Sequence, residues 1–212
     1  IVSYLGRVNY SYDQRYMLTV SFRTDGSSEF APGNRWGYFP SFSAGWDISR
    51  EKFLERWTRN GVLSQLKLRA GWGATGNKSA AVRSQIVSLM GTSRGVDYAF
   101  GADKTSDPLI AVYPKSRGNS RLKWETGQQY NIGLDVSMFD RKLNMTLDLY
   151  RKYTNDMILT IDLPVYAQFP SSPKANMGSM RSNGLDFSVS YDNHAGEFTY
   201  GISANVSAYK SV

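Results

Sequence analysis

Apolar and polar residues alternate with period two in segment after segment of this chain. In the clearest segment one face carries Tyr130, Ile132, Leu134, Val136 and Met138, and the other carries Gln129, Asn131, Gly133, Asp135 and Ser137. Successive side chains of a β-strand point to opposite faces, so this alternation is typical of strands with one apolar and one polar face. The same pattern occurs within residues 4–12, 16–23, 36–48, 66–73, 124–138, 143–149, 185–191 and 198–206. The sequence therefore predicts an all-β fold of antiparallel strands.

The length of these segments favours strands that cross a membrane. Several exceed the usual soluble strand of about 5 or 6 residues and reach the ~9–11 residues that a tilted membrane strand needs. Aromatic residues make up 14% of the chain and charged residues only 20%, which suits surfaces that pass from apolar to wet surroundings. No run of about 18 apolar residues occurs, so the sequence excludes a transmembrane helix and, at its start, a signal peptide.

The connections between the segments differ in length in a regular way. Short turns are expected at 13–15, 140–142 and 193–197, and longer joins at 26–35, 77–121 and 164–175. If the strands run alternately up and down, all short turns fall at one end and all long joins at the other. The exception is a moderate join at 50–62, which carries a short helical piece at 51–57 and falls at the short-turn end. Short periplasmic turns opposite long extracellular loops are typical of outer-membrane barrels.

Aromatic residues gather where the two membrane interfaces would lie. Those near the short turns are Tyr10, Tyr12, Tyr16, Phe139, Tyr191 and Phe198, and those near the long joins are Trp36, Tyr38 and Trp124. We interpret them as two interfacial girdles. Aromatic residues in the core of a soluble β-sandwich are the alternative.

One motif suggests a nucleotide site but lacks its context. Gly71, Gly73 and Gly76 match the dinucleotide pattern G-x-G-x-x-G, and Asp97 follows about 20 residues later. That pattern needs a strand buried on both faces, whereas Lys67 alternates with apolar residues in the strand that precedes it. We therefore interpret the glycines as small residues on the polar wall of a strand or at its end.

Other signs of chemistry are weak. The chain has no cysteine, and its one histidine, His194, stands in a polar turn where solvent exposure is expected. Two carboxylate pairs are candidates for calcium in loops, namely Asp25 with Glu29 and Asp103 with Asp107. Apart from these pairs no cofactor or metal is expected, and no catalytic residues are predicted. The net charge of +7 is spread along the chain, so nucleic acid is not an expected partner.

An ordered set of phrases extends over nearly the whole chain. It consists of RTDGSSEF at 23–30, YFPSFSAGW at 38–46, LKLRAGWGATGN at 66–77, LKWET at 122–126, NIGLD at 131–135, NMGSM at 176–180 and NGLD at 183–186. Together these phrases resemble the SusC/RagA family of TonB-dependent outer-membrane transporters. The resemblance implies an antiparallel transmembrane β-barrel of twenty-two strands around a plug, of which this chain would supply about eight. Since the chain opens with Ile1 in mid-pattern, we expect residues 1–212 to be an internal part of a single barrel domain, without plug or signal peptide.

The resemblance also implies a function and a set of partners. Family members import glycan or peptide fragments with energy from TonB, which would act through the missing N-terminal region, and they work beneath a SusD-like surface lipoprotein. The chain would then lie among the lipids of the outer membrane of a Gram-negative bacterium, and it would not be an enzyme. A passive porin shares every barrel feature above, and a soluble β-rich binding module is a further alternative.

Two groups of residues are candidates for contacts inside and outside such a barrel. Inward polar side chains would line the lumen or hold the plug, and these are Arg69, Glu125, Gln129, Asn131 and Asp135. Aromatic residues of the join 77–121 are candidates for contact with substrate or lid, and these are Tyr98, Phe100 and Tyr113. A purely structural loop is the alternative for the second group.

Overall fold

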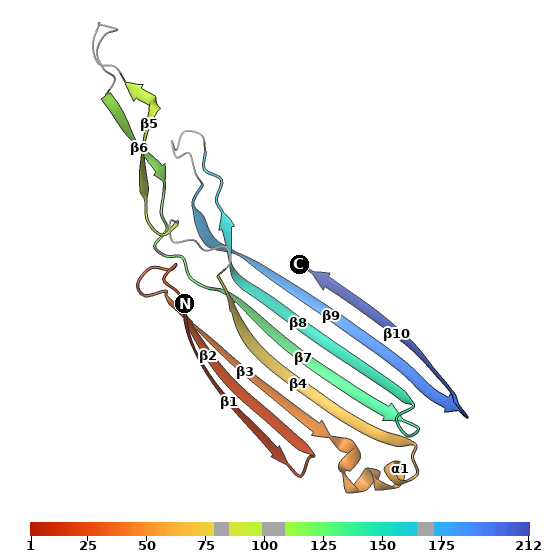
Figure 1. Ribbon diagram of the computed structural model, residues 1–212. Coiled ribbons are helices and arrows are strands. Elements are labelled where there is room, and N and C mark those ends of the chain that lie inside the picture. Colours follow the sequence, from red (N-terminus) through yellow and green to blue (C-terminus); the bar gives the residue numbers. More distant parts are fainter. Residues whose placement is uncertain (79–84, 99–108, 165–171) are drawn as a thin grey trace.

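The computed structural model describes residues 1–78, 85–98, 109–164 and 172–212, and its main body is one curved antiparallel sheet (Figure 1). Eight strands pair in the order β1-β2-β3-β4-β7-β8-β9-β10. Their bounds are β1 Val2–Tyr12, β2 Tyr16–Gly26, β3 Trp36–Asp47, β4 Leu63–Asn77, β7 Glu125–Met138, β8 Leu143–Thr160, β9 Lys174–Ala195 and β10 Phe198–Ser211. Strands β5 (Leu89–Tyr98) and β6 (Leu109–Ser116) form a separate hairpin that projects beyond the sheet (Figure 1).

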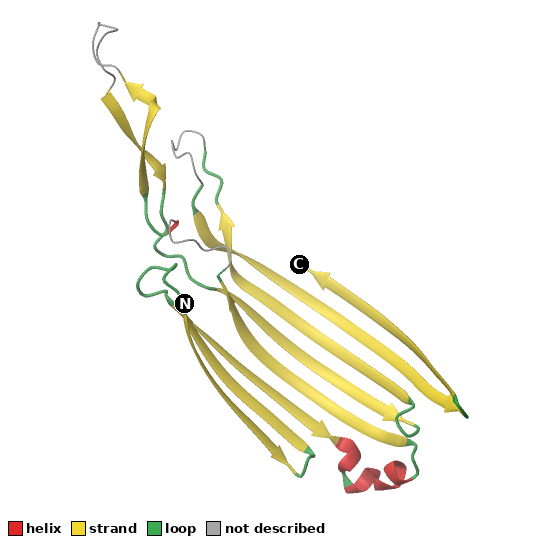
Figure 2. Ribbon diagram, viewed as in Figure 1, coloured by secondary structure: helices red, strands yellow, loops and turns green. Residues whose placement is uncertain are grey.

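The short turns lie together at one end of the sheet, as the sequence predicts. The β1–β2, β7–β8 and β9–β10 turns share this end with the helical connection from β3 to β4, and the longer connections lie at the opposite end (Figure 2). That helical connection consists of η1 (Ile48–Arg50), η2 (Lys52–Leu54) and α1 (Glu55–Arg59), close to the helical piece expected at 51–57. Positive φ angles at Asp13 (49°) and Gln14 (53°) close the first turn, as tight hairpins require.

The register places the apolar residues of all eight strands on one face. Leu134 pairs with Leu68 on one side and with Leu147 on the other, and Leu147 pairs in turn with Phe187. We call this the outer face, and the opposite side, which carries Arg69, the inner face. The predicted alternation of the strands is confirmed.

The outer face is uncovered. Ile132 is 58% exposed and Ile202 is 71% exposed, and no second layer of described residues packs on them. Buried hydrophobic residues among those described are confined to the loop end and its approaches, namely Phe30, Ala31, Phe39, Leu122, Trp124 and Ile158. A soluble sandwich would bury its apolar face, and none of the described residues buries it here. In the described part of the chain, no helix is long and apolar enough to cross a membrane.

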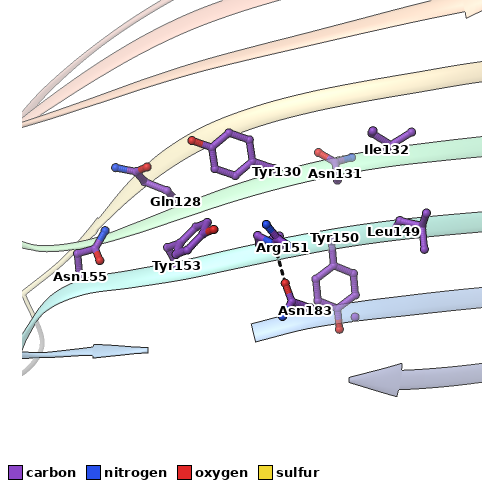
Figure 3. Close-up of a pocket in the computed structure, with 11 residues that line it drawn as sticks. Gln128, Tyr130, Asn131, Ile132, Leu149, Tyr150, Arg151, Tyr153, Asn155 and Asn183 are labelled. Atoms are coloured by element: carbon purple, nitrogen blue, oxygen red, sulfur yellow. Dashed lines mark hydrogen bonds between the residues drawn. The ribbon is translucent and has the colours of Figure 1, made fainter. Parts of the chain in front are cut away.

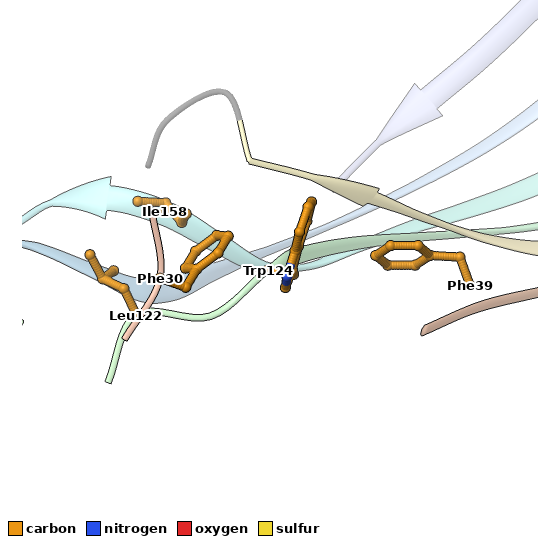
Figure 4. Packing of buried hydrophobic residues seen from close by; sticks show 5 residues of the cluster. All are labelled: Phe30, Phe39, Leu122, Trp124 and Ile158. Carbon is orange, nitrogen blue, oxygen red and sulfur yellow. The ribbon is translucent and has the colours of Figure 1, made fainter. Parts of the chain in front are cut away.

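The buried cluster at the loop end joins segments that are far apart in the sequence (Figure 4). Phe30, from the β2–β3 connection, and Leu122, just before β7, are completely buried. Trp124 lies between two phenylalanine rings, with its centroid 5.2 Å from that of Phe30 and 5.7 Å from that of Phe39. Its indole Nε1 donates a hydrogen bond of 3.1 Å to the Arg35 carbonyl oxygen. The cluster therefore fixes the loop bases to one another.

The loop end differs from the sequence predictions in three respects. Trp124 was expected in an interfacial girdle, but this is wrong, because it is only 8% exposed and packs inside the cluster. The join 77–121 was expected to be a loop, but it contains the β5–β6 hairpin. Strands β8 and β9 also run well beyond the predicted 143–149 and 185–191. Trp36 and Tyr38, 46% and 63% exposed on the outer face, agree with the girdle.

At the short-turn end Tyr16, one of the residues predicted for the girdle, packs beside Trp46, which the prediction did not include. The rings of Tyr16 and Trp46 stack with centroids 6.3 Å apart. Both donate hydrogen bonds to Glu51 Oε1, over 2.6 Å from the Tyr16 hydroxyl and 3.1 Å from the Trp46 indole. These bonds, that of Tyr16 above all, lower the pKa of Glu51 below its usual value. An apolar ring with a bonded polar tip is what a membrane interface favours.

Candidate functional site

An ion-pair network on the inner face joins β4, β7 and β8. Arg69 Nε donates to Asp135 Oδ2 over 2.7 Å, and its Nη2 donates to Asp135 Oδ1 over 2.9 Å, so that this pair is bidentate. The same Nη2 reaches Asp148 Oδ2 at 3.1 Å. All three side chains are about one-third exposed, so solvent screening keeps the contribution of the pairs to stability modest. The network holds three strands in one register.

Gly133 leaves the space that the network occupies. It pairs with Arg69 on one side and with Asp148 on the other. A Cβ atom at Gly133 would lie 2.7 Å from Arg69 Nη2 and closer still to Asp148 Oδ1. The bridge from Arg69 to Asp148 therefore passes over a position that only glycine leaves open.

We expect Gly133→Ala to displace this bridge and to lower the free energy of unfolding by about 0.5–1 kcal/mol, since the atoms that must move end flexible side chains. Gly6→Ala is the matched control, because nothing lies within 4 Å of a Cβ atom there. The control should stay within about 0.5 kcal/mol of the unchanged protein. Urea unfolding of the refolded full-length protein measures both. Equal values for the two variants would mean that the bridge contributes nothing.

Other glycines allow close packing on the same face. Gly71 pairs with Asn131, and a Cβ atom at Gly71 would lie 2.6 Å from Asn131 Oδ1. Gly73 pairs with Gln129, which is exposed. These are two of the glycines of the G-x-G-x-x-G pattern, and the strand that carries them pairs only with antiparallel neighbours. The interpretation of these two as small residues on the polar wall is confirmed, and the antiparallel pairing does not give the parallel βαβ context that the dinucleotide pattern requires.

Glu125 takes part in a different set of contacts. Its Oε1 accepts a hydrogen bond from Asn77 Nδ2 over 3.0 Å, and its Oε2 accepts one from the Ile158 backbone N–H over 3.4 Å. It therefore ties the loop-side ends of β4, β7 and β8 together. The structure thus places Arg69, Gln129, Asn131 and Asp135 on one wall and joins only Arg69 and Asp135 directly.

Comparison with known proteins identifies this architecture. Residues 3–211 match the family model described as TonB dependent receptor-like, beta-barrel. The chain belongs to this family. It is 35% identical over 208 residues to the TonB-dependent receptor SusC of Bacteroides thetaiotaomicron. The aligned region covers 97% of this chain and 20% of SusC. It is 33% identical over 212 residues to the TonB-dependent receptor P3 of Formosa agariphila, covering 100% of this chain and 20% of that protein.

A solved structure of the RagAB peptide importer in its closed-closed state gives the same fold. The two superpose with a TM-score of 0.82 at 28% identity, over 99% of this chain and 22% of that chain. This chain spans about a fifth of the length of the curated relatives it matches. The predicted resemblance to the SusC/RagA family and the transmembrane β-barrel fold are confirmed. As part of a TonB-dependent receptor barrel, the sheet lies in the outer membrane.

In a TonB-dependent receptor barrel the polar inner face lines the lumen. We therefore expect the wall formed by Arg69, Gln129, Asn131 and Asp135 to face the lumen, and we call it the lumen wall. Its orientation and its contacts with a plug or a substrate stay predictions. Asp148 belongs to the same wall and was missed as a candidate, although the alternation placed it on the polar face.

The aromatic candidates of the join 77–121 fall in and beyond the β5–β6 hairpin. Tyr113 lies in β6, pairs with Gly91, and holds its ring against that glycine. Tyr98 ends β5 and pairs with Leu109. Phe100 lies outside the described residues. Contact of the β5–β6 hairpin with a substrate or with a lipoprotein lid stays a prediction.

Calcium binding stays a prediction as well. Asp25 accepts hydrogen bonds of 2.9 Å from Arg23 Nε, and Glu29 forms an ion pair of 2.8 Å with Lys78. Asp103 and Asp107 lie outside the described residues. Within residues 1–78, 85–98, 109–164 and 172–212, no group of three or more carboxylates or histidines is placed to hold a metal. His194 is exposed, as expected.

Proposed function

We propose that this chain is part of the barrel wall of a SusC-like transporter that actively imports nutrient oligomers across the outer membrane. The observation that carries the proposal is the superposition of nearly the whole chain on the RagAB peptide importer, with a TM-score of 0.82. The 35% identity to SusC over almost the same residues supports it. In the proposed activity an intact molecule crosses the membrane, and no residue is proposed to take part in a chemical reaction.

The chemistry of the lumen wall suits a polar cargo. Gln129 and Asn131 offer both donors and acceptors of hydrogen bonds, and Arg69 is already paired with Asp135 and Asp148 on the same wall. Such a wall can exchange hydrogen bonds with the hydroxyl groups of a glycan or the amides of a peptide without holding a charged group tightly. We therefore propose glycan or peptide fragments as the substrate class.

Two partners complete the proposal. A SusD-like surface lipoprotein would cover the loop end, where the loop bases pack around Trp124 and the β5–β6 hairpin projects beyond the sheet. TonB would supply energy through the part of the transporter N-terminal to this barrel segment. Both partners are inferred from the family resemblance, and the packed loop end supports the first of them.

A native pull-down tests the lipoprotein partner. We expect the full-length transporter, tagged and extracted in a mild detergent, to bring down a surface lipoprotein in near-equal amount. A variant without residues 89–116, a range that includes β5 and β6, should retain less of this lipoprotein, while its heat-modifiable folded form stays unchanged. Recovery of the full-length barrel alone, under detergents that keep related pairs intact, would count against the proposal.

Uptake in cells separates an active importer from a passive porin. Uptake of a labelled oligosaccharide or peptide mixture by cells that express the full-length protein should fall to background when TonB is deleted. Uptake that persists at the same rate without TonB would favour the porin.

A further inference from the structure

Charged residues on the outer face are confined to one place. We consider the outer-face positions of β1–β4 and β7–β10 from the short turns up to the row that contains Gln128, Tyr153 and Arg181. Among these described positions there is no Asp or Glu, and the only charged residues are Arg151, Arg181 and Lys210. All three are cations, and all three lie at the loop end of adjacent strands.

The register brings these three cations close together. Tyr130, Arg151, Asn183 and Lys210 form one row across β7, β8, β9 and β10. Arg181 stands one row nearer the loops, opposite Tyr153, and its backbone is bonded to that of Val212. Neighbouring strands lie about 4.8 Å apart, so the three side chains project from a patch about 10 Å wide.

A pocket lies beside Arg151 along β7, β8 and β9, lined mostly by outer-face residues and also by Asn131, Tyr150 and Gly184 from inner-face positions (Figure 3). Arg151 Nε donates a hydrogen bond of 2.6 Å to Asn183 Oδ1, which orients the guanidinium and leaves both of its Nη groups available. Towards the short turns the pocket is lined by Ile132 and Leu149, which are 58% and 47% exposed. A cationic group thus stands on the loop side of apolar side chains that none of the described residues covers.

Within the described parts of the chain, no carboxylate contacts any of the three cations. The inner-face cation Arg69, by contrast, holds two carboxylates. Since charges that face a membrane are costly unless they are paired, the contrast indicates that the outer-face cations meet their anions outside this chain.

Their depth in the membrane identifies the kind of anion. Each strand residue climbs about 2.5 Å along the membrane normal, taking a rise of ~3.3 Å and a tilt of roughly 40°. Tyr130 stands ten residues from Asp140 in the short turn, so an apolar band about 25 Å tall ends near its row. The cations therefore lie at the level of lipid headgroups on the long-loop side, which is the cell surface in an outer-membrane barrel.

We propose that Arg151, Arg181 and Lys210 bind the phosphate groups of an anionic lipid in the outer leaflet, with an acyl chain along Ile132 and Leu149. Guanidinium groups present paired donors that match phosphate oxygens, and an ammonium group adds a compact charge. The aromatic rings of Tyr130 and Tyr153, with centroids 6.2 Å apart, flank the site at the height where interfacial aromatics are favoured. A carboxylate-rich protein surface is the competing occupant, and the test separates it.

The test uses the full-length protein, purified in a neutral detergent and titrated with bisphosphorylated lipid A, with bound lipid counted by native mass spectrometry. We expect the triple variant Arg151→Gln, Arg181→Gln, Lys210→Gln to lose at least about tenfold in affinity, as the removal of charge-assisted phosphate contacts implies. The control Arg56→Gln, Arg141→Gln, Lys142→Gln removes the same charge at the short-turn end and should lose less than about twofold. Dephosphorylated lipid A should bind the unchanged protein as weakly as the triple variant binds lipid A.

Three results would overturn the proposal. The first is equal affinity of the triple variant and the unchanged protein for lipid A. The second is equal binding of lipid A and its dephosphorylated form, which would leave acyl contacts alone. The third is the loss of a co-purifying protein or second copy from the triple variant with lipid binding unchanged. If the triple variant does not fold, Arg181→Gln and Lys210→Gln singly should each lose about threefold, and unchanged affinity in both would equally overturn it.

Discussion

Trp124→Ala is expected to lower the free energy of unfolding by about 3–5 kcal/mol, the largest effect that a single side chain of this chain should have. The indole is 8% exposed, contacts the rings of Phe30 and Phe39, and donates a hydrogen bond to the Arg35 carbonyl oxygen. Its removal would leave a cavity between rigid rings and would take one of two hydrogen bonds from the Arg35 carbonyl oxygen, which also accepts from the Ser27 backbone N–H over 3.0 Å. Urea unfolding of the refolded full-length protein in detergent measures the change.

Trp57→Ala is the matched control for this substitution. Trp57 lies in α1 at the opposite end of the sheet and is 58% exposed, so its truncation should change the free energy of unfolding by no more than about 0.5 kcal/mol. A cost for Trp57→Ala as large as that for Trp124→Ala would show that the loop-end cluster does not hold the loop bases together. The Trp124 variant should also expose the loop bases to added protease.

The wrong placement of Trp124 in the girdle shows that the alternation of apolar and polar residues predicts side-chain positions only within the strands. By parity Trp124 belongs with Tyr130 and Ile132 on the outer face, and the alternation gives no sign that the chain turns away just before β7. Its burial arises from contact with Phe30, which comes from a different loop. The strands themselves were predictable because lipid and lumen impose the alternation along their membrane-spanning parts. Beyond the membrane both faces of a strand are exposed to water, so the loop-end parts of β8 and β9 lose the alternation of apolar and polar residues.

The lumen wall was predictable as a set of residues but not as a network. Alternation places Arg69, Asp135 and Asp148 on the polar face, yet which of them meet depends on the register between β4, β7 and β8. The same holds for Gly133, whose role appears only when Arg69 and Asp148 lie on either side of it. The cationic patch on the outer face likewise comes from three strands, and no single segment reveals it.

The assignment of the outer and inner faces can be tested with charged substitutions at a position on each face, one of them near the middle of the membrane. Leu134 lies on the outer face, between Leu68 and Leu147, near the middle of the apolar band. Leu134→Arg would place a charge near the bilayer midplane, and it should cost about 2–4 kcal/mol and impair assembly.

Gln129→Arg is the control in the same strand. Gln129 is exposed on the inner face, opposite Gly73 and Lys152. An arginine there keeps its access to the water of the lumen, and repulsion from Lys152 should add at most about 1 kcal/mol. The readout is the fraction of full-length protein that reaches the outer membrane in a folded, heat-modifiable form. We expect a large loss for Leu134→Arg and a small one for Gln129→Arg. Equal tolerance of both, or greater damage from Gln129→Arg, would overturn the assignment of the two faces, and with it the lumen wall and the lipid site.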